Sequence, residues 1–173
     1  MWDWNIWFKR VNKYESYSKQ LEEVVKDIQD LGQTYLDVGC GDGRLIRRMK
    51  DKDVDGLDKH YNNFDLLKDE WPDKQYDVIV FNLVLVHFNK EEVEYVKNKA
   101  LERAKKYIYI HDECRVGLSS NNKKCCEMID DITNKYCHDH KNHFKDKCLN
   151  EIYSKPSDEN PIWTRYLFEK TKD

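Results

Sequence analysis

The sequence predicts an α/β protein with a doubly wound, mainly parallel β-sheet that helices cover on both sides, giving three layers. Three observations support this fold class. Short apolar runs alternate with longer amphipathic segments along most of the 173 residues, which is typical of β-α-β units. A glycine-rich turn joins the first apolar run to a helix-like segment. The chain closes with two strand-like segments around a proline-containing loop, which predicts an antiparallel hairpin.

Hydrophobic spacing predicts each element in turn. Residues 14–31 carry apolar side chains at helical spacing, and Gly32 is a natural helix end. The pattern then predicts strands at 34–38 and 54–57, with a helix to about residue 50 between them. A strongly apolar strand at 76–81, a charged helix at 91–106 and a strand at 107–110 follow. The last part is predicted as a polar and mainly helical segment at 118–150 and hairpin strands at 151–155 and 164–170.

We expect one domain over residues 1–173, because this length suits a single core. Its parts are an aromatic N-terminal segment with a helix at 1–33, a central core at 34–113, a helical insert at 114–150 and a closing hairpin at 151–173. The aromatic residues near the N-terminus either pack on the core or form a lid over a substrate pocket. They are Trp2, Trp4, Trp7 and Phe8.

Composition argues against several classes of protein. The formal net charge is -3, so no overall positive field favours nucleic acid. The N-terminus lacks the basic start and apolar core of a signal peptide, and no apolar run is long enough to cross a bilayer. The six cysteines show no secreted spacing pattern and indicate a reducing compartment. We therefore expect a cytoplasmic protein without membrane association.

A glycine-rich turn is the most specific motif in the chain. It lies in Leu36-Asp-Val-Gly-Cys-Gly-Asp-Gly43. Glycine lets the backbone turn sharply and lets a ligand approach closely, and the helix that follows offers free N–H groups at its N-terminus. Asp58 ends the next strand beside this turn, where a carboxylate can accept hydrogen bonds from two ribose hydroxyls. These residues predict a nucleotide-sized ligand at the carboxyl end of the first strand.

The motif and the strands after it resemble the class I, Rossmann-like S-adenosylmethionine-dependent methyltransferases, especially the small members of that family. The resemblance runs over about residues 34–112 and extends to the final hairpin. It implies S-adenosyl-L-methionine as the cofactor, with Asp37 near the methionine amino group and Asp58 on the ribose. The cofactor-binding residues that it implies are Asp37, Gly39, Cys40, Gly41, Gly43, Asp58, Lys59, Asp65, Leu66 and Asn82.

Dinucleotide-binding proteins use a related turn and are the main alternative. Their turn normally reads GxGxxG, whereas this one reads GxGxG. Asp37, just before the turn, would also face a diphosphate unfavourably. The pattern therefore favours S-adenosylmethionine over a dinucleotide.

The chain is short between Asp58 and Tyr76, where the family usually has a helix and a third strand. Only seventeen residues are available, so we expect the helix to be lost or reduced to a turn and residues 62–67 to form the third strand and its end. Asp65 is then the candidate for the adenine amino group, with Leu66 packing on the ring. The alternative is that Asp65 is a surface aspartate in a turn.

Methyl transfer needs an aligned acceptor, exclusion of water and sometimes a base. The acceptor should lie near the carboxyl ends of the fourth and fifth strands, among Asn82, His87, His111, Asp112 and Glu113. His87 is the first choice for a base or an acceptor-orienting group, because histidine titrates near neutral pH. A histidine at a helix start, held by backbone groups, is the alternative. His111 and Asp112 follow an apolar strand and are expected to face the same cleft.

The residues after the fourth strand exclude two familiar types of acceptor chemistry. Phe81-Asn-Leu-Val stands where an Asn/Asp-Pro-Pro-Tyr/Phe motif would indicate amino-group methylation of adenine or glutamine, and no Pro-Cys pair is present for a covalent route to pyrimidines. Direct transfer to an O, N or S atom of a small molecule remains the leading expectation. RNA or protein methylation, or a non-catalytic cofactor-binding subunit, are the alternatives.

Cysteine and histidine are concentrated in the 118–148 region. Cys137-x-x-His140-x-x-His143, with Cys148 nearby, could place metal ligands on one helical side. No paired CxxC knuckle is present and polar helices often carry solvated histidines, so we assign no metal site. The expected role of this segment is to shape the acceptor site, together with the aromatic N-terminus.

Overall fold

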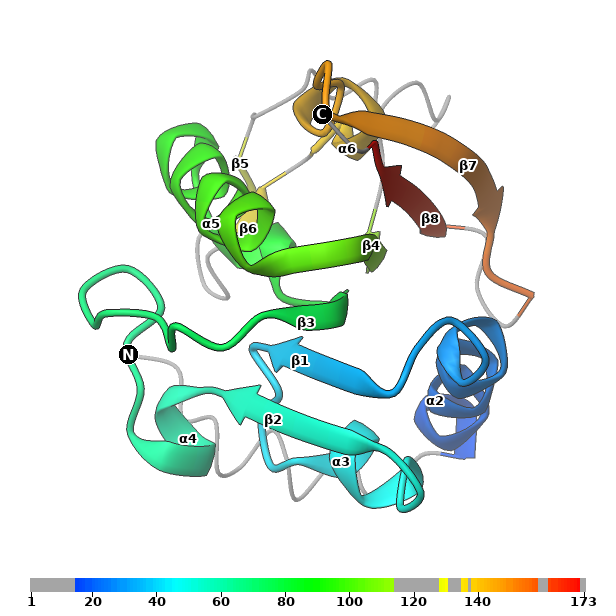
Figure 1. The fold of residues 1–173 in the computed structure, drawn as a ribbon. Coiled ribbons are helices and arrows are strands. Elements are labelled where there is room, and N and C mark those ends of the chain that lie inside the picture. Colours follow the sequence, from blue (N-terminus) through cyan, green and yellow to red (C-terminus); the bar gives the residue numbers. More distant parts are fainter. Residues whose placement is uncertain (1–14, 114–127, 131–134, 137, 159–161, 172–173) are drawn as a thin grey trace.

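The computed structural model describes residues 15–113, 128–130, 135–136, 138–158 and 162–171. Its centre is a six-stranded sheet with the order β2-β1-β3-β4-β8-β7 (Figure 1). The strands are β1 (Thr34–Val38), β2 (Asp53–Leu57), β3 (Tyr76–Asn82), β4 (Ala104–Glu113), β7 (Leu149–Pro156) and β8 (Trp163–Lys170). The first four run parallel, and β8 pairs antiparallel with both β4 and β7. The predicted mainly parallel sheet with a C-terminal antiparallel hairpin is confirmed.

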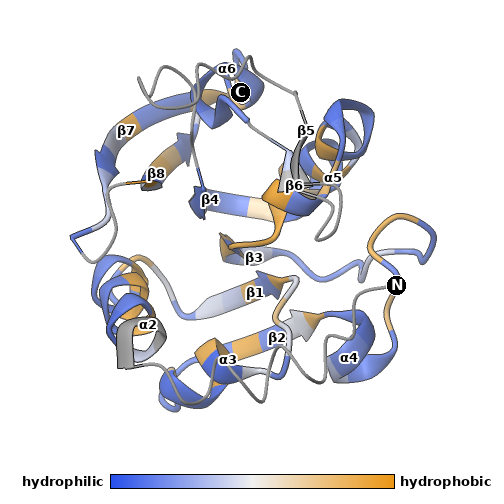
Figure 2. Ribbon diagram, turned by 180° about the vertical axis from the view of Figure 1, so that it is seen from behind, coloured by the Kyte–Doolittle hydropathy of each residue, from blue (hydrophilic) through white to orange (hydrophobic). Residues whose placement is uncertain are grey.

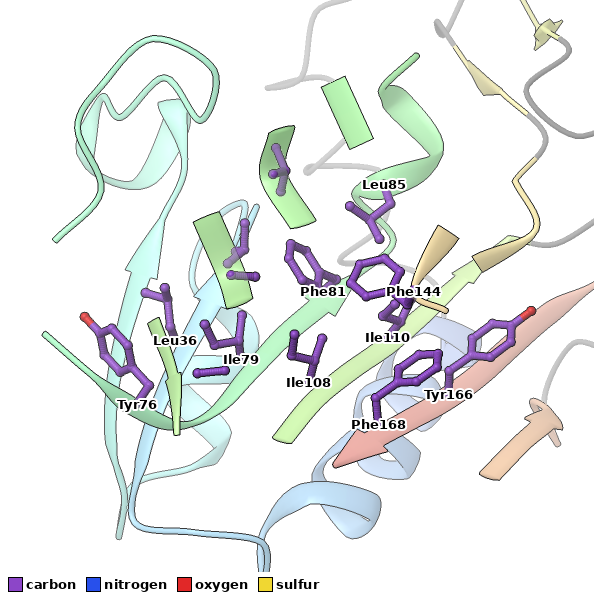
Figure 3. Close-up of a cluster of buried hydrophobic side chains, with 14 of the residues drawn as sticks. Leu36, Tyr76, Ile79, Phe81, Leu85, Ile108, Ile110, Phe144, Tyr166 and Phe168 are labelled. Carbon is purple, nitrogen blue, oxygen red and sulfur yellow. The ribbon is translucent and has the colours of Figure 1, made fainter. Parts of the chain in front are cut away.

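Helices cover both faces of this sheet. The helical elements are α2 (Glu15–Ile28), α3 (Arg44–Arg48), α4 (Lys59–Asn62), the 3-10 turn η1 (Leu85–His87), α5 (Lys90–Arg103) and α6 (His140–His143). One buried cluster joins α2 and α3 to the sheet through residues such as Val24 and Leu45. A second cluster joins α5 and the segment after β6 to the opposite face, through Val96, Phe144 and the side chains shown in Figure 3. The two clusters confirm the three-layer arrangement.

Polar and apolar residues are distributed as this packing requires. Figure 2 shows α4 as almost wholly hydrophilic, whereas β3 is rich in hydrophobic residues. The strongly apolar β3 is central, and its residues from Val78 to Phe81 are buried. A continuous apolar run is typical of a strand covered on both faces.

The expected third strand at 62–67 is absent, so that prediction is wrong. The helix after β2 is reduced to the single turn α4, as expected, and β2 then forms the edge of the sheet. Trp71 explains why no strand is needed, because it is 1% exposed and belongs to the core cluster on the α5 face. Its Nε1 donates to the carbonyl of Leu66 at 3.1 Å, which holds the irregular segment in place.

The described part of the 118–150 segment is not mainly helical, so the prediction of a helical segment there is wrong. It forms the small strands β5 (Met128–Asp130) and β6 (Lys135–Tyr136) and the one-turn helix α6, and β7 already begins at Leu149. Asp139 caps the start of α6, and the helix ends at His143. The next residue, Phe144, is fully buried. Burial against the sheet therefore decides the local conformation here.

The charged helix also ends earlier than its pattern indicates. α5 stops at Arg103, and Ala104 already pairs with Tyr76 of β3. Lys106, expected in the helix, forms an ion pair with Asp77 across the two strands, with 3.3 Å between Nζ and Oδ1. The aromatic residues of the N-terminus lie outside the described residues.

Candidate active site

The glycine-rich turn between β1 and α3 has a backbone that only glycine adopts easily. Gly39, Gly41 and Gly43 have φ angles of 72°, 61° and 77°, in the left-handed region. A Cβ atom on Gly39 would lie 2.3 Å from Cγ2 of Val84, so a side chain would also clash. The Gly39 N–H donates to the carbonyl of Leu57 at 2.8 Å, which fixes the turn against the end of β2.

Asp58 joins the turn to the second strand. Its Oδ2 accepts the N–H of Gly41 at 3.0 Å, and its Oδ1 accepts the N–H of His60 at 2.7 Å as the cap of α4. Each carboxylate oxygen has a second lone pair for a ligand. Lys59 is exposed on α4 next to this carboxylate.

Asp37 is a buried carboxylate at the end of β1. It is 2% exposed, and among the described residues its side chain makes no hydrogen bond or ion pair. Burial, reinforced by the charge of Asp58, raises its pKa to about 8. Burial likewise raises the pKa of the Cys40 thiol, so Cys40 is an inert part of the turn. A buried carboxyl with no cation beside it suits a cationic ligand group, which would stabilise its charged form.

Asp65 and Leu66 follow α4 in an irregular segment. The Asp65 Oδ1 accepts the N–H of Leu67 at 3.1 Å, and its Oδ2 lies 3.4 Å from Nζ of Lys68. The Leu67 hydrogen bond is the main cause of the lowered pKa of Asp65. Leu66 packs against the core cluster on the α5 face. Asp65 therefore has the geometry of an aspartate in a turn, the alternative considered from the sequence.

Asn82 and His111 meet at the carboxyl ends of β3 and β4, where they are register partners. The His111 Nδ1 lies 2.8 Å from the Asn82 Oδ1. Because an amide oxygen only accepts, Nδ1 carries the hydrogen and Nε2 keeps a lone pair. Burial, together with the charge of Arg165, lowers the pKa of His111 to about 4. Nε2 is buried without a hydrogen-bond partner in the described residues, and the imidazole is neutral at pH 7.

Asp112 points to the opposite face of the sheet from His111, so the expectation that both face one cleft is wrong. Neighbouring side chains on a strand alternate between faces. The Asp112 Oδ2 accepts the N–H of Val86 at 2.8 Å and its Oδ1 accepts the N–H of Glu113 at 2.8 Å. Asp112 thus anchors η1 to the end of β4.

The turn after β3 contains His87 and also Leu83, which no sequence pattern singles out. Leu83 has a φ angle of 56° and donates its N–H to the carbonyl of His111 at 2.7 Å. This unusual backbone redirects the chain from β3 into η1. His87 is half-buried at the end of η1, with its N–H donated to the carbonyl of Val84. Trp163 of β8 was also missed, and its ring meets that of His111 edge-on at 5.9 Å.

The fold and the site define an α/β protein that holds a nucleotide-sized ligand at the carboxyl ends of parallel strands. A family model described as a methyltransferase domain matches residues 9–108. The chain belongs to this methyltransferase family, which confirms its identification as a class I S-adenosylmethionine-dependent methyltransferase.

Solved structures with the same fold support this assignment. The PH0226 protein of Pyrococcus horikoshii OT3 has a TM-score of 0.68 and 15% identity, covering 92% of this chain and 93% of its own. Magnesium protoporphyrin IX methyltransferase of Synechocystis PCC 6803, with bound SAM, has a TM-score of 0.66 and 14% identity, covering 90% and 80%. The 1,6-didemethyltoxoflavin-N1-methyltransferase of Burkholderia thailandensis, with its substrate and S-adenosylhomocysteine, has a TM-score of 0.69 and 10% identity, covering 93% and 80%.

No characterised protein sequence matches the chain. Across the described ranges, no helix has the length and apolarity needed to cross a membrane.

Proposed function

We propose that this protein transfers a methyl group from S-adenosylmethionine to an O, N or S atom of a small molecule by direct in-line displacement. The observation that carries the proposal is the pair of carboxylates, Asp37 and Asp58, around the three left-handed glycines. When bound, S-adenosylmethionine supplies an activated methyl group on its sulfonium. The protein then has to hold the donor, orient the acceptor and exclude water.

The residues around the glycine turn fit this cofactor. Asp37 offers a buried carboxyl without a cation beside it, and the amino group of the methionine moiety would stabilise its charged form. Asp58 already uses one lone pair of each oxygen to hold the backbone and has one left on each for the ribose hydroxyls. Gly39, Gly41 and Gly43 let the ligand approach the backbone, and Lys59, Asp65 and Leu66 remain candidates beside the adenine.

His111 is the residue that best suits orientation of the acceptor. Its Nε2 lone pair can accept a hydrogen bond from an acceptor N–H or O–H, and Asn82 fixes the tautomer that makes this possible. A pKa of about 4 makes His111 a weak base, so its role is orientation more than proton removal. His87, at the end of η1, is the candidate for a base with a less buried side chain. Asp112 acts through η1, as a positioning residue.

A small-molecule acceptor is favoured over RNA by charge. The net charge is -3, and the acidic and basic residues number 33 and 30, so no strong positive field draws a polyanion. The 1,6-didemethyltoxoflavin-N1-methyltransferase, which has the same fold, acts on a small molecule. We extend this acceptor class to the chain as part of the proposal, together with a cytoplasmic location.

Cofactor binding and transfer can be tested separately. Calorimetric titration with S-adenosylhomocysteine should show binding, and Asp58→Ala should lose it while Asp73→Ala, changing a fully exposed carboxylate, keeps it. Radiolabelled S-adenosylmethionine should then label a small-molecule fraction of a cell extract and not purified RNA. Failure of the wild type to bind either S-adenosylmethionine or S-adenosylhomocysteine would contradict the proposal. Labelling confined to RNA would contradict the small-molecule acceptor and favour RNA methylation.

A further inference from the structure

The second strand ends at the edge of the sheet, beside the carboxylate that we assign to the ribose. Within the described residues, β2 pairs with β1 on one side and with no strand on the other. On the inner side, the carbonyl of Leu57 accepts the N–H of Gly39. Because backbone groups alternate between the two sides of a strand, the carbonyl of Gly56 and the N–H of Asp58 point to the outer side. Without the third strand expected from the sequence, these two groups need other partners.

The side chain of Asn62 supplies both partners. Its Oδ1 accepts the N–H of Asp58 at 3.1 Å, and its Nδ2 donates to the carbonyl of Gly56 at 2.9 Å. In a parallel sheet, one residue of a neighbouring strand makes the same two bonds, because its carbonyl and its N–H bind groups two residues apart. A carboxamide offers the same acceptor and donor as a peptide group. The Asn62 side chain therefore takes the place of a strand neighbour at the end of β2.

This pair of bonds completes the set of contacts that holds Asp58. The residue keeps the extended backbone of a strand, with φ −162° and ψ 148°. Its carbonyl accepts the N–H groups of Asn62 at 3.1 Å and Phe64 at 3.2 Å. Its carboxylate holds the N–H groups of Gly41 and His60. The Asn62 carboxamide binds the remaining backbone group, the N–H, so α4 and the glycine turn together fix the direction of the carboxylate.

The helix that carries Asn62 is too short to hold this position by itself. α4 spans Lys59–Asn62, and none of its side chains is buried. A single helical turn is marginal in water, because nucleation of a helix is costly. The ring of Tyr61 gives a second tie, since a Cβ atom on Gly43 would lie 2.7 Å from its Cε2. That ring is 47% exposed, so the two bonds of Asn62 are the polar link between the end of α4 and β2.

We propose that Asn62 is a positioning residue for the methyl donor: its carboxamide replaces a strand neighbour and so holds Asp58 in the direction that binds the ribose. The inference rests on the proposed function through Asp58, and Asn62 itself makes no contact with the cofactor in this arrangement. Asn62 is exposed, so its replacement opens no cavity in the core and should leave the fold in place. The expected result is a loss of cofactor affinity without a comparable loss of stability.

Two other roles for Asn62 give different results. A side chain that contacts the cofactor directly would contribute to affinity independently of Asp58, so the effects of the two changes would add. A side chain that only completes α4 would change stability and leave affinity as it is. A residue that acts through another shows a coupling free energy in a double-mutant cycle. The cycle between positions 58 and 62 therefore separates the three roles.

The first test is calorimetric titration of the full chain with S-adenosylhomocysteine. Asn62→Ala should raise the Kd by about tenfold, because the carboxylate loses its fixed direction. Asn150→Ala, which changes an exposed asparagine on the edge strand β7, should leave the Kd within about twofold of the wild type. The double variant Asp58→Ala with Asn62→Ala should bind no more weakly than Asp58→Ala alone. Alanine favours a helix more than asparagine does, so a loss of helix propensity in α4 does not explain weaker binding.

The second test needs no cofactor. Hydrogen exchange measured by NMR in the free protein should show the Asp58 N–H exchanging at least about tenfold faster in Asn62→Ala, since it has lost its acceptor. The Gly39 N–H, which is bonded to Leu57, should exchange as in the wild type. The melting temperature should fall by less than about 2 °C.

The outcomes distinguish a failure of this inference from a failure of the proposed function. A wild type that binds neither S-adenosylmethionine nor S-adenosylhomocysteine would contradict the proposed function, and with it any role of Asn62 in binding. Loss of affinity in Asp58→Ala with unchanged affinity in Asn62→Ala would overturn the positioning role alone. Additive losses in the double variant, or equal exchange of the Asp58 N–H in both proteins, would overturn it as well.

Discussion

The two ends of the site are built in different ways. At the donor end, the turn, Asp37 and Asp58 lie within 22 residues of one another, and backbone groups make most of the contacts. At the acceptor end, Asn82 meets His111 across 29 positions and Val86 meets Asp112 across 26. The donor end is a local motif that glycine geometry fixes, whereas the acceptor end exists only because β3 and β4 are neighbours. Changes to the donor end should alter cofactor affinity, and changes to the acceptor end should alter stability or turnover.

The largest expected effect is that of Asp58→Ala on cofactor affinity. In the proposed binding mode the change removes two charge-assisted hydrogen bonds to the ribose, each contributing about 1.5–3 kcal/mol, so the Kd for S-adenosylhomocysteine should rise by about 100-fold or more. Titration calorimetry measures it, with Asp73→Ala as the matched control. Unchanged affinity in Asp58→Ala would contradict the proposal that the cofactor binds beside Asp58 and the glycine turn.

Asp37 should make cofactor binding depend on pH. Its pKa of about 8 in the free protein means that the carboxyl is mostly protonated at pH 7, and a ligand ammonium group needs the charged form. Affinity should therefore rise by about 50-fold from pH 6 to pH 8, with uptake of the ligand releasing a proton below pH 8. Calorimetry in two buffers of different ionisation enthalpy detects that proton.

The raised pKa of Asp37 also makes the free energy of unfolding depend on pH. The folded protein holds this proton up to about pH 8, while the unfolded chain releases it near pH 4. Asp37 thus lowers the free energy of unfolding progressively between those values. Asp37→Asn should be more stable than the wild type at pH 8 in urea unfolding and bind the cofactor weakly. A variant that is less stable at pH 8 would contradict the assignment of Asp37 as an uncompensated buried charge.

Asp112→Ala should act on stability at the acceptor end. The change leaves the buried N–H groups of Val86 and Glu113 without their acceptor, which costs about 2 kcal/mol. Urea unfolding measures this loss, and calorimetry should show cofactor affinity changed less than threefold. A large loss of affinity with stability intact would mean that the two ends are not separate.

The smallest effects distinguish the two candidate histidines. His111→Gln should lower kcat by about tenfold with the KM for S-adenosylmethionine unchanged, because one orienting hydrogen bond of about 1.4 kcal/mol is lost. His87→Gln should lower kcat less than threefold if His111 has the orienting role. The reverse order would return the role to His87, the first choice from the sequence. Initial rates with an identified acceptor provide the measurement.

The strands and the donor motif could be predicted because their signals are local. The apolar run of β3, the glycine pattern and the aspartate after β2 each depend on a few neighbouring residues. The missing third strand could not be foreseen, since it depends on Trp71 reaching the core from outside any regular element. The predicted helix at 91–106 is too long for a similar reason, because Ala104 pairs with Tyr76 and belongs to β4.

The histidines of the 118–148 region show the same limit most clearly. Spacing alone drew attention to Cys137, His140 and His143, which a helix would place on one side. Only the folded chain brings His138 to within 3.4 Å of His143 and places Phe88 and Glu94 beside the other nitrogens of these two rings.

The sequence by itself determined the fold class and the donor motif, because glycine conformations and strand patterns are properties of short segments. Tertiary structure alone decided that His111 and Asp112 lie on opposite faces, that Asn82 sets the tautomer of His111, and that three histidines share one buried place. These contacts join residues through packing across strands and between layers, and no local pattern encodes such distances.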